Sequence, residues 1–525
     1  MNFWKHPGAC LLIISGVVLL SACRNYHRNT IYTAVTRDQI ERGEALAHIY
    51  CQSCHLFPEP SLLDAGSWDK GVLPGMGPRL GIFSFEFKHY PSYLRDQTLE
   101  KGYYPSKPLL TNQQWSDILA FYLATSPDSL PGQDRERPIR NDLTLFSPVS
   151  PAARYYMPTT CYIKVDSSLQ TGKTLLVGDA FRNKLYRFDQ GLNLVDSASL
   201  KGPVVDIHYE KNELLACNIG ILLPNNGKHG SAQPIRVSAD GKMTPDSLPL
   251  FDSLQRPVQI TPVDINGDGK MDYVVCEFGF LTGSLSWMEN LGGNRFKRHV
   301  IRAVPGAIKV YVTDYNHDGL PDLWVLFAQG DEGIFLFTNK GKGEFTTDPV
   351  LRFPPIYGSC YFELDDFNGD GYPDILYTCG DNGDFSPVLK PYHGVYIFLN
   401  DGKNHFTQKY FYPINGCYKA IARDFDGDGD LDIATISFFA DYAHQPEEGF
   451  VYLENKGNFK FEPHTLAAGR SGRWLTMDAG DFDGDGKTDL LLGNFSVAPG
   501  PLKSGTDWKK NPPFLFLKNI GTGKN

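Results

Sequence analysis

The chain has 525 residues, which is too long for one ordinary domain but fits one large repeat array with a small module in front. Its composition is globular, with 42% hydrophobic residues, and its 52 Gly and 36 Pro favour many turns. The formal charge of −10 argues against nucleic acid as a partner. Many of the acidic residues are aspartates in five short loops described below. We therefore interpret the negative charge as that of metal-binding carboxylates and not as a sign of a basic partner.

Residues 1–22 are predicted to be a signal peptide. A lysine precedes an apolar run, residues 9–20, that is too short to span a bilayer. The run leads into the motif LSAC, which ends at Cys23 and resembles a bacterial lipobox. The resemblance implies cleavage before Cys23 and acylation of that residue, whereas the alternative is an ordinary secretory signal. We therefore expect a protein of the bacterial cell envelope, anchored to a membrane on the periplasmic side or the cell surface, with residues 23–36 as a tether.

The next motif reads CQSCH at residues 51–55. Two thiols at this spacing can form thioethers with both vinyl groups of a haem, and the adjacent histidine can ligate the iron. A disulfide or half of a zinc site is the alternative, but the sequence has no second CxxC to complete a zinc site. The motif therefore predicts a covalently bound haem c at Cys51, Cys54 and His55.

The stretch from residue 37 to 126 resembles a class I monohaem cytochrome c domain. Such domains place one helix before the haem motif and end in a second helix packed against the first. A capping box at Thr111 and Gln114 predicts the start of that last helix. Its apolar stripe comprises Trp115, Ile118, Leu119, Tyr122 and Leu123. The resemblance implies electron transfer to or from a redox partner protein.

The sixth iron ligand should be a Met or His between the two helices. Met76, in the loop LPGMGP, is the only Met there. Its position 21 residues after His55 is shorter than the spacing usual in the family, and His89 is the competing ligand. A Met ligand would raise the haem potential and suit electron transfer. Residues 127–141, rich in Pro and charge, read as a linker.

Five copies of one phrase follow, starting at Asp264, Asp314, Asp366, Asp424 and Asp481. Each has a carboxylate or amide at positions 1, 3 and 5, Gly at 6 and Asp at 9, which suits Ca²⁺. Position 7 would offer its backbone carbonyl. The predicted calcium ligands are Asp264, Asn266, Asp268, Lys270, Asp272, Asp314, Asn316, Asp318, Leu320, Asp322, Asp366, Asn368, Asp370, Tyr372, Asp374, Asp424, Asp426, Asp428, Asp430, Asp432, Asp481, Asp483, Asp485, Lys487 and Asp489. An EF-hand needs Glu at position 12, but these loops have apolar or β-branched residues there and lead into strands.

The loops recur at spacings of 50, 52, 58 and 57 residues, and each unit contains four predicted strands without a helix. Four strands per unit predict a propeller blade. Two earlier units lack the calcium phrase, which brings the count to seven blades. The last unit stops after its third strand, so we predict that residues 143–150 supply the fourth and close the ring. The expected fold is thus a small all-α domain followed by an all-β seven-bladed propeller.

Residues 142–525 resemble the FG-GAP/VCBS family of calcium-bearing β-propellers, found in integrin α chains and many bacterial surface proteins. The resemblance implies that each loop joins the first and second strands of its blade. It also implies that the calcium is structural.

Long inserts are expected on the face opposite the calcium loops, where binding sites tend to lie. They carry polar residues including Asp331, Glu332 and His444, with Lys309 and Lys419 nearby, but no recognisable catalytic set. Six cysteines fall at strand ends on this face, either as free buried thiols or with at most one or two disulfides among them: Cys161, Cys217, Cys276, Cys360, Cys379 and Cys417.

Three functions fit these features. The first is an exported, lipid-anchored c-type cytochrome whose propeller binds a partner or ligand. The second is an oxidoreductase that oxidises a sugar or alcohol on the propeller and passes electrons to the haem, an analogy with quinoprotein dehydrogenases whose tryptophan-rich repeats are absent here. The third is a carbohydrate-binding or lyase-like propeller, which would not need the haem.

Overall fold

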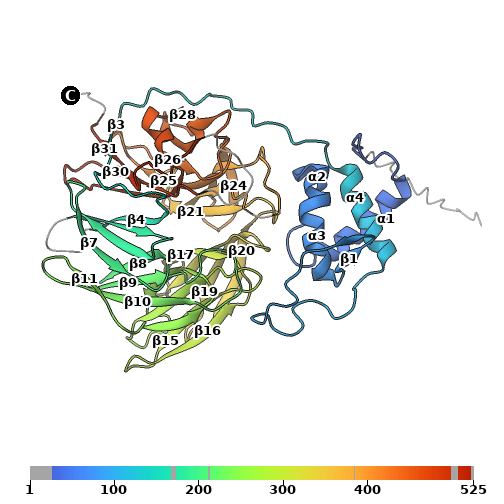
Figure 1. The fold of residues 1–525 in the computed structure, drawn as a ribbon, viewed down its shortest axis with the longest axis horizontal. Coiled ribbons are helices and arrows are strands. Elements are labelled where there is room, and N and C mark those ends of the chain that lie inside the picture. Colours follow the sequence, from blue (N-terminus) through green and yellow to red (C-terminus); the bar gives the residue numbers. More distant parts are fainter. Residues whose placement is uncertain (1–25, 167–172, 211–212, 384, 498–505, 522–525) are drawn as a thin grey trace, which may run out of the picture.

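A computed structural model describes residues 26–166, 173–210, 213–383, 385–497 and 506–521. A helical module lies beside a β-propeller of seven blades, and a long connecting segment runs from one to the other (Figure 1). The predicted signal peptide and Cys23 lie outside the described residues. Within the described ranges, no helix has the length and apolar character needed to cross a membrane.

Two long helices form the frame of the helical module. They are α1 (Arg37–Tyr50) and α4 (Asn112–Thr125), and both begin with a capping box. The helices cross closely at Gly43, where a Cβ atom would lie 2.0 Å from the backbone oxygen of Asp117. The Asp117 carboxylate also accepts a hydrogen bond from Arg42 Nε at 2.9 Å. Gly43 is therefore required by the close approach of the two backbones and not by its own conformation.

Short elements connect the two helices and complete the module's core. Trp68, Trp115 and Tyr122 are almost completely buried there, and the stripe predicted on the last helix faces this core. The connecting elements are η1 (Pro60–Leu62), α2 (Ala65–Ser67), η2 (Trp68–Val72), α3 (Leu73–Met76), η3 (Gly77–Leu80), β1 (Ser84–Phe85) and β2 (Lys88–His89).

The propeller strands follow one another outward from the axis in each blade. Blade 1 contains β4 (Thr160–Asp166), β5 (Thr174–Asp179), β6 (Lys184–Phe188) and β7 (Leu194–Ser199). Blade 2 contains β8 (Val204–Glu210), β9 (Glu213–Asn218), β10 (Gly230–Val237), β11 (Met243–Pro245) and β12 (Phe251–Leu254). Blade 3 contains β13 (Pro257–Val263), β14 (Asp272–Glu277), β15 (Ser284–Asn290) and β16 (Phe296–Arg302). Blade 4 contains β17 (Ala307–Thr313), β18 (Asp322–Phe327), β19 (Gly333–Asn339) and β20 (Phe345–Arg352).

The remaining blades repeat the pattern, with η4 (Pro446–Gly449) and η5 (Ala467–Ser471) as short helical turns. Blade 5 contains β21 (Ser359–Asp365), β22 (Asp374–Cys379), β23 (Gly394–Asn400) and β24 (Phe406–Pro413). Blade 6 contains β25 (Cys417–Arg423), β26 (Asp432–Ser437), β27 (Phe450–Asn455) and β28 (Phe461–His464). Blade 7 contains β29 (Trp474–Gly480), β30 (Asp489–Asn494), β31 (Phe514–Asn519) and β3 (Phe146–Val149).

The predicted closure of the ring is confirmed, because β3 pairs antiparallel with β31 from Phe146–Asn519 to Val149–Phe516. Blade 2 differs from the predicted four strands. Its outer strand is divided into β11 and β12, which both pair with β10. The outer strand is interrupted after Pro245, where β11 ends. The chain then returns to the edge of β10 and pairs with it again as β12.

Side chains on the innermost strands bind the backbone of the next blade. Asp206 in blade 2 accepts from the amide of Ile260 at 3.3 Å, and Glu363 in blade 5 accepts from Ala422 at 3.0 Å. Asp478 in blade 7 accepts from the amide of Val165 in blade 1 at 2.9 Å. Lys419 in blade 6 donates to Met477 O of blade 7 at 2.8 Å. These bonds link neighbouring blades around the axis, including the pair that joins the two ends of the repeat array.

The helical module docks on the propeller loops that join second and third strands. Tyr392, between β22 and β23, donates to Leu62 O at 3.0 Å. Asn226, between β9 and β10, donates to Asp96 at 2.9 Å, and Tyr103 donates to Leu281 O, between β14 and β15, at 3.3 Å. The calcium phrases join first and second strands, so the module lies on the opposite face.

Candidate functional site

The CQSCH motif begins where α1 ends. Cys51 is the C-cap residue of α1, and its backbone amide donates to Ala47 O at 2.8 Å. Its side chain is half-buried against the module's core, whereas Cys54 is exposed. Both thiols are free. The helix end thus holds one thiol against the core and presents the other outward.

His55 has the hydrogen-bond arrangement of a metal-ligating histidine. Its Nδ1 lies 2.9 Å from Leu56 O, which favours a proton on Nδ1 and leaves the Nε2 lone pair available to a metal. Burial lowers the pKa of His55, and the bond to Leu56 acts in the opposite direction. The neutral imidazole that a metal requires is therefore the favoured form. Two free thiols and one such imidazole fit the donor set of a haem c.

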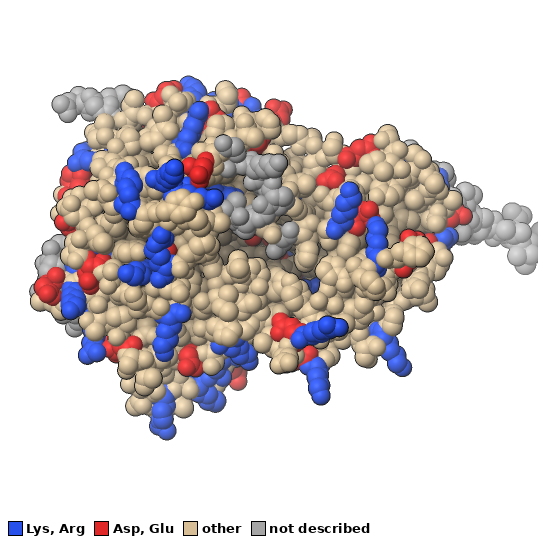
Figure 2. All heavy atoms as spheres, viewed as in Figure 1, with Lys and Arg blue, Asp and Glu red and all other residues tan. Residues whose placement is uncertain are grey.

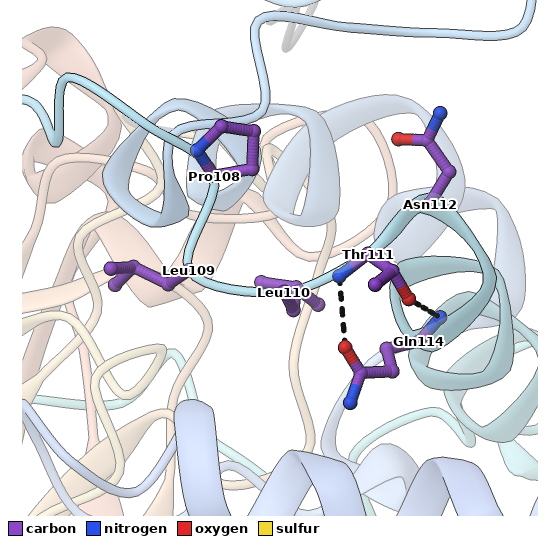
Figure 3. Close-up of a pocket in the computed structure, with 6 residues that line it drawn as sticks. All are labelled: Pro108, Leu109, Leu110, Thr111, Asn112 and Gln114. Carbon is purple, nitrogen blue, oxygen red and sulfur yellow. Dashed lines mark hydrogen bonds between the residues drawn. The ribbon is translucent and has the colours of Figure 1, made fainter.

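An open surface hollow of about 490 Å³ lies along the segment that leads into α4 (Figure 3). Tyr50, the last residue of α1, donates from its hydroxyl to Leu109 O at 3.3 Å, which places the hollow next to the motif. Figure 3 shows Thr111 and Gln114 joined by the two bonds of the predicted capping box. The lining residues are Pro108, Leu109, Leu110, Thr111, Asn112 and Gln114.

The two candidates for a sixth ligand lie in different surroundings. Met76 ends α3 and packs against the same core cluster as Cys51. His89 lies in the short strand β2 and is exposed. Of these two residues, Met76 is the one that reaches the module's core.

The five calcium phrases adopt one repeated geometry. In each, the Asp at position 9 is the first residue of the second strand and is completely buried. The Gly at position 6 has a positive φ, between 79° and 95°, which requires glycine. In four loops the position-1 carboxylate accepts a hydrogen bond from that Gly at 2.8–3.1 Å. The carboxylates therefore curl around the loop centre.

Carboxylates converge where the phrases are richest in Asp. Ligand atoms of Asp424, Asp426 and Asp432 lie within 4.8 Å of one another, as do those of Asp481, Asp483 and Asp489. Burial raises the pKa of Asp432 to about 7, while a hydrogen bond from Tyr452 acts in the opposite direction. A divalent cation would offset the cost of holding these carboxylates together. The donor set is thus the all-oxygen set that Ca²⁺ prefers.

The sequence analysis missed a group of asparagines that hydrogen-bond to the last residues of each calcium loop. They end the third strands of the five calcium-phrase blades, and we call them the strand-end asparagines: Asn290, Asn339, Asn400, Asn455 and Asn519. In every case the backbone amide donates to the position-9 Asp at 2.7–2.8 Å. The side-chain amide donates to the carbonyl at position 8, at 3.0–3.2 Å. The recurring Asn-x-Gly after each third strand was the available signal.

The opposite face carries the other residues singled out in the sequence. The six cysteines on it are free thiols, five of them buried and Cys161 half-buried. Glu332 is buried with 2% exposure, so it is not a surface ligand. Asp331 pairs with Arg302 at 2.6 Å, and the exposed His444 has its Nδ1 3.0 Å from an Asp441 oxygen. No set of these side chains forms a recognisable catalytic group within the described ranges.

The family match to known proteins lies within the propeller. Four stretches match the FG-GAP-like repeat: residues 264–325, 314–377, 366–435 and 438–492, of which the first three overlap. The chain carries FG-GAP repeats. The first three matches each begin at the first Asp of a calcium phrase and end within the second strand of the next blade. The repeats and the seven-bladed propeller predicted from the sequence are therefore confirmed.

The individual proteins that match this chain are similar over only part of its length or at low sequence identity. Cartilage acidic protein 1 of Xenopus tropicalis is 30% identical over 196 residues, which cover 34% of this chain and 27% of that protein. Among solved structures, BBS1N in complex with ARL6DN matches with a TM-score of 0.44 and 12% identity, covering 74% of this chain and 99% of that one. Virginiamycin B lyase from Staphylococcus aureus matches with a TM-score of 0.42 and 12% identity, covering 71% and 98%.

Proposed function

We propose that the protein is an exported, lipid-anchored c-type cytochrome that transfers electrons, with a calcium-stabilised FG-GAP propeller that binds a partner or ligand. The arrangement at the end of α1 carries the proposal. Cys51 and Cys54 are free thiols, and the carbonyl of Leu56 orients His55 so that Nε2 is left for a metal. When bound, a haem c would supply a one-electron carrier.

The chain's own residues would determine how such a carrier behaves. Cys51 and Cys54 would attach the haem covalently, and His55 and Met76 would be its iron ligands. The packed core around Trp115 and Tyr122 excludes water from one side of the motif. A dry environment and a Met ligand both favour a high reduction potential. The proposed acylation of Cys23 would keep the module at a membrane, within reach of a redox partner protein.

The propeller's calcium would be structural in this proposal. The proposed ligands are buried or curled into closed loops, and the position-9 carboxylates are already bonded to the strand-end asparagines. Such sites stabilise strand connections and offer no open position to a substrate. The partner or ligand would bind instead on the face with the long inserts, which also receives the helical module.

A second candidate, oxidation of a sugar or alcohol on the propeller, is favoured by one observation. The helical module docks on the face with the inserts, with Tyr392 and Leu281 at the contact. Electrons released on that face would have a short path to the motif. This reading differs from the first in predicting that a small molecule reduces the haem without a partner protein.

The test is an absorption spectrum of the full chain, produced in a host that attaches haem c, before and after reduction with dithionite. We expect a haem c band that is lost in the C51A/C54A variant, that changes in M76A and that persists in the matched control H89A. Reduction by a sugar or alcohol without a mediator would select the second candidate. Absence of any haem band from the wild-type chain would refute both.

A further inference from the structure

Two arginines and an aspartate form a cluster at the rim of blades 3 and 4. Arg302 ends β16, Arg352 ends β20, and Asp331 lies in the loop between β18 and β19. Arg302 Nη2 donates to one Asp331 oxygen at 2.6 Å, and Arg352 pairs with the other oxygen. The Arg302–Asp331–Arg352 cluster therefore carries a net charge of +1, because one carboxylate neutralises only one of the two guanidinium groups.

Arg302 is held in place by aromatic rings. Its guanidinium carbon lies 4.4 Å from the ring centre of Phe327 and 4.0 Å from that of Phe335, and 19% of its side chain is exposed. Its Nη1 is buried and has no hydrogen-bond partner. A buried guanidinium donor without an acceptor is costly and rare in folded proteins. The unsatisfied donor indicates that an acceptor group belongs at this position.

The cluster lies on the propeller face that receives the helical module. The loop that carries Asp331 joins the second and third strands of blade 4, and the corresponding loops of blades 3 and 5 contact the module at Leu281 and Tyr392. Arg79, in η3, donates to the Tyr103 hydroxyl at 2.7 Å, and that hydroxyl donates to Leu281 O of blade 3. Figure 2 shows the surface hollowed between the propeller and the helical module.

We propose that Arg79, Arg302 and Arg352 bind the two propionate carboxylates of the haem, so that the cofactor is shared between the helical module and the propeller. This inference rests on the proposed function. A guanidinium forms short, charge-assisted and often bidentate bonds with a carboxylate. Three arginines opposed by one aspartate leave two positive charges, which match the two propionates. The propeller would then set the haem potential as well as bind a partner.

The test is the reduction potential of the full-length haem-loaded protein, measured by spectroelectrochemical titration. R352Q and R302Q should lower the potential, because loss of positive charge favours the oxidised, more positive haem. D331N should raise it for the opposite reason. R236Q is the matched control: this blade 2 arginine is 70% exposed and paired with Asp246, and its loss should leave the potential unchanged.

Shifts of opposite sign distinguish charge near the haem from general damage to the fold. Potentials unchanged in R352Q and D331N, or shifted in the same direction, would overturn the inference. R302K keeps the charge and should stay close to the wild type. If R302Q does not fold, R352Q decides the matter, because Arg352 is 38% exposed and lies outside the aromatic stack. A wild-type chain without haem refutes the proposed function itself, whereas a haem band with unmoved potentials refutes only this inference.

Discussion

At the scale of single residues, Glu332 is a carboxylate buried in the propeller next to Asp331. It accepts hydrogen bonds from the backbone amide of Ser359 at 2.9 Å and from its hydroxyl at 2.6 Å. The same hydroxyl lies 2.6 Å from Tyr377 Oη. Burial raises the pKa of Glu332 to about 8, although the Ser359 bonds act in the opposite direction, and Asp381 adds to the increase. Glu332 is thus largely protonated at neutral pH in the folded chain.

We predict that Glu332 makes stability fall as the pH rises. The folded chain binds the proton up to about pH 8, whereas an unfolded chain releases it near 4.5, so folding is favoured by protonation between these values. The free energy of unfolding should lose up to about 1.4 kcal/mol per pH unit across this window from this one group. Urea denaturation at several pH values should show a flatter decline for E332Q. The exposed control E344Q should keep the wild-type slope, and equal slopes for E332Q and wild type would refute the prediction.

Some of the important residues can be recognised from the sequence alone, whereas others become apparent only in the folded chain. The chemistry of the CQSCH motif lies in five consecutive residues, so it can be read without a fold. Arg302 and Arg352 are 29 and 21 positions from Asp331, and only the packing of blades 3 and 4 brings them together. The strand-end asparagines repeat at a regular place, but their role depends on strand pairing with the position-9 aspartates. Local motifs are therefore predictable, and contacts across strands are not.

At the scale of elements, each calcium phrase is a loop that ends in a buried second strand. The strands β18, β22, β26 and β30 are buried at every position, because blades pack on both sides of them. Apolar, β-branched residues after each phrase predicted this strand correctly. The outer strand of blade 2 was not predicted as divided, because a break within an edge strand leaves little hydrophobic signal.

Removal of calcium should lower the melting temperature of the propeller. A ligand that binds only the folded chain stabilises it by about 2.7 kcal/mol per site at a hundredfold excess over Kd. Calorimetry in EDTA and in excess Ca²⁺ should therefore give clearly separated transitions. Substitution D424N should reduce that separation, whereas D348N, on the exposed strand β20, should not. Identical transitions with and without EDTA would contradict the prediction.

At the scale of the whole molecule, the propeller is closed by strands from its two ends. Blade 7 takes β3 from before the first blade, and Asp478 of the same blade bonds to Val165 of blade 1. The connecting segment is also attached: Arg135 pairs with the buried Glu448, and its Nε donates to Pro413 O at 2.8 Å. The predicted linker therefore runs along blades 5 and 6 on its way to β3, as Figure 1 shows.

Loss of β3 should open the ring. A chain that begins at residue 142 retains this strand, whereas a chain that begins at 151 leaves the edge of β31 unpaired. We expect the shorter chain to melt at a lower temperature and to aggregate, because an unpaired edge recruits other strands. Differential scanning calorimetry and light scattering of the two chains measure both effects. Equal melting temperatures and equal scattering would show that closure does not depend on β3.

The sequence by itself determined the repeats, the number of blades and the closing strand. It also supplied the haem-attachment motif, which stays a hypothesis. These depend on local periodicity and on short motifs whose members are neighbours in the chain. Only the tertiary structure decided where the helical module docks, because that contact joins residues as distant as Leu62 and Tyr392. It alone brought Arg79 to the junction with blade 3 and assembled the Arg302–Asp331–Arg352 cluster. The physical reason is that these charges meet through the packing of separate blades and loops, which leaves no periodic trace in the sequence.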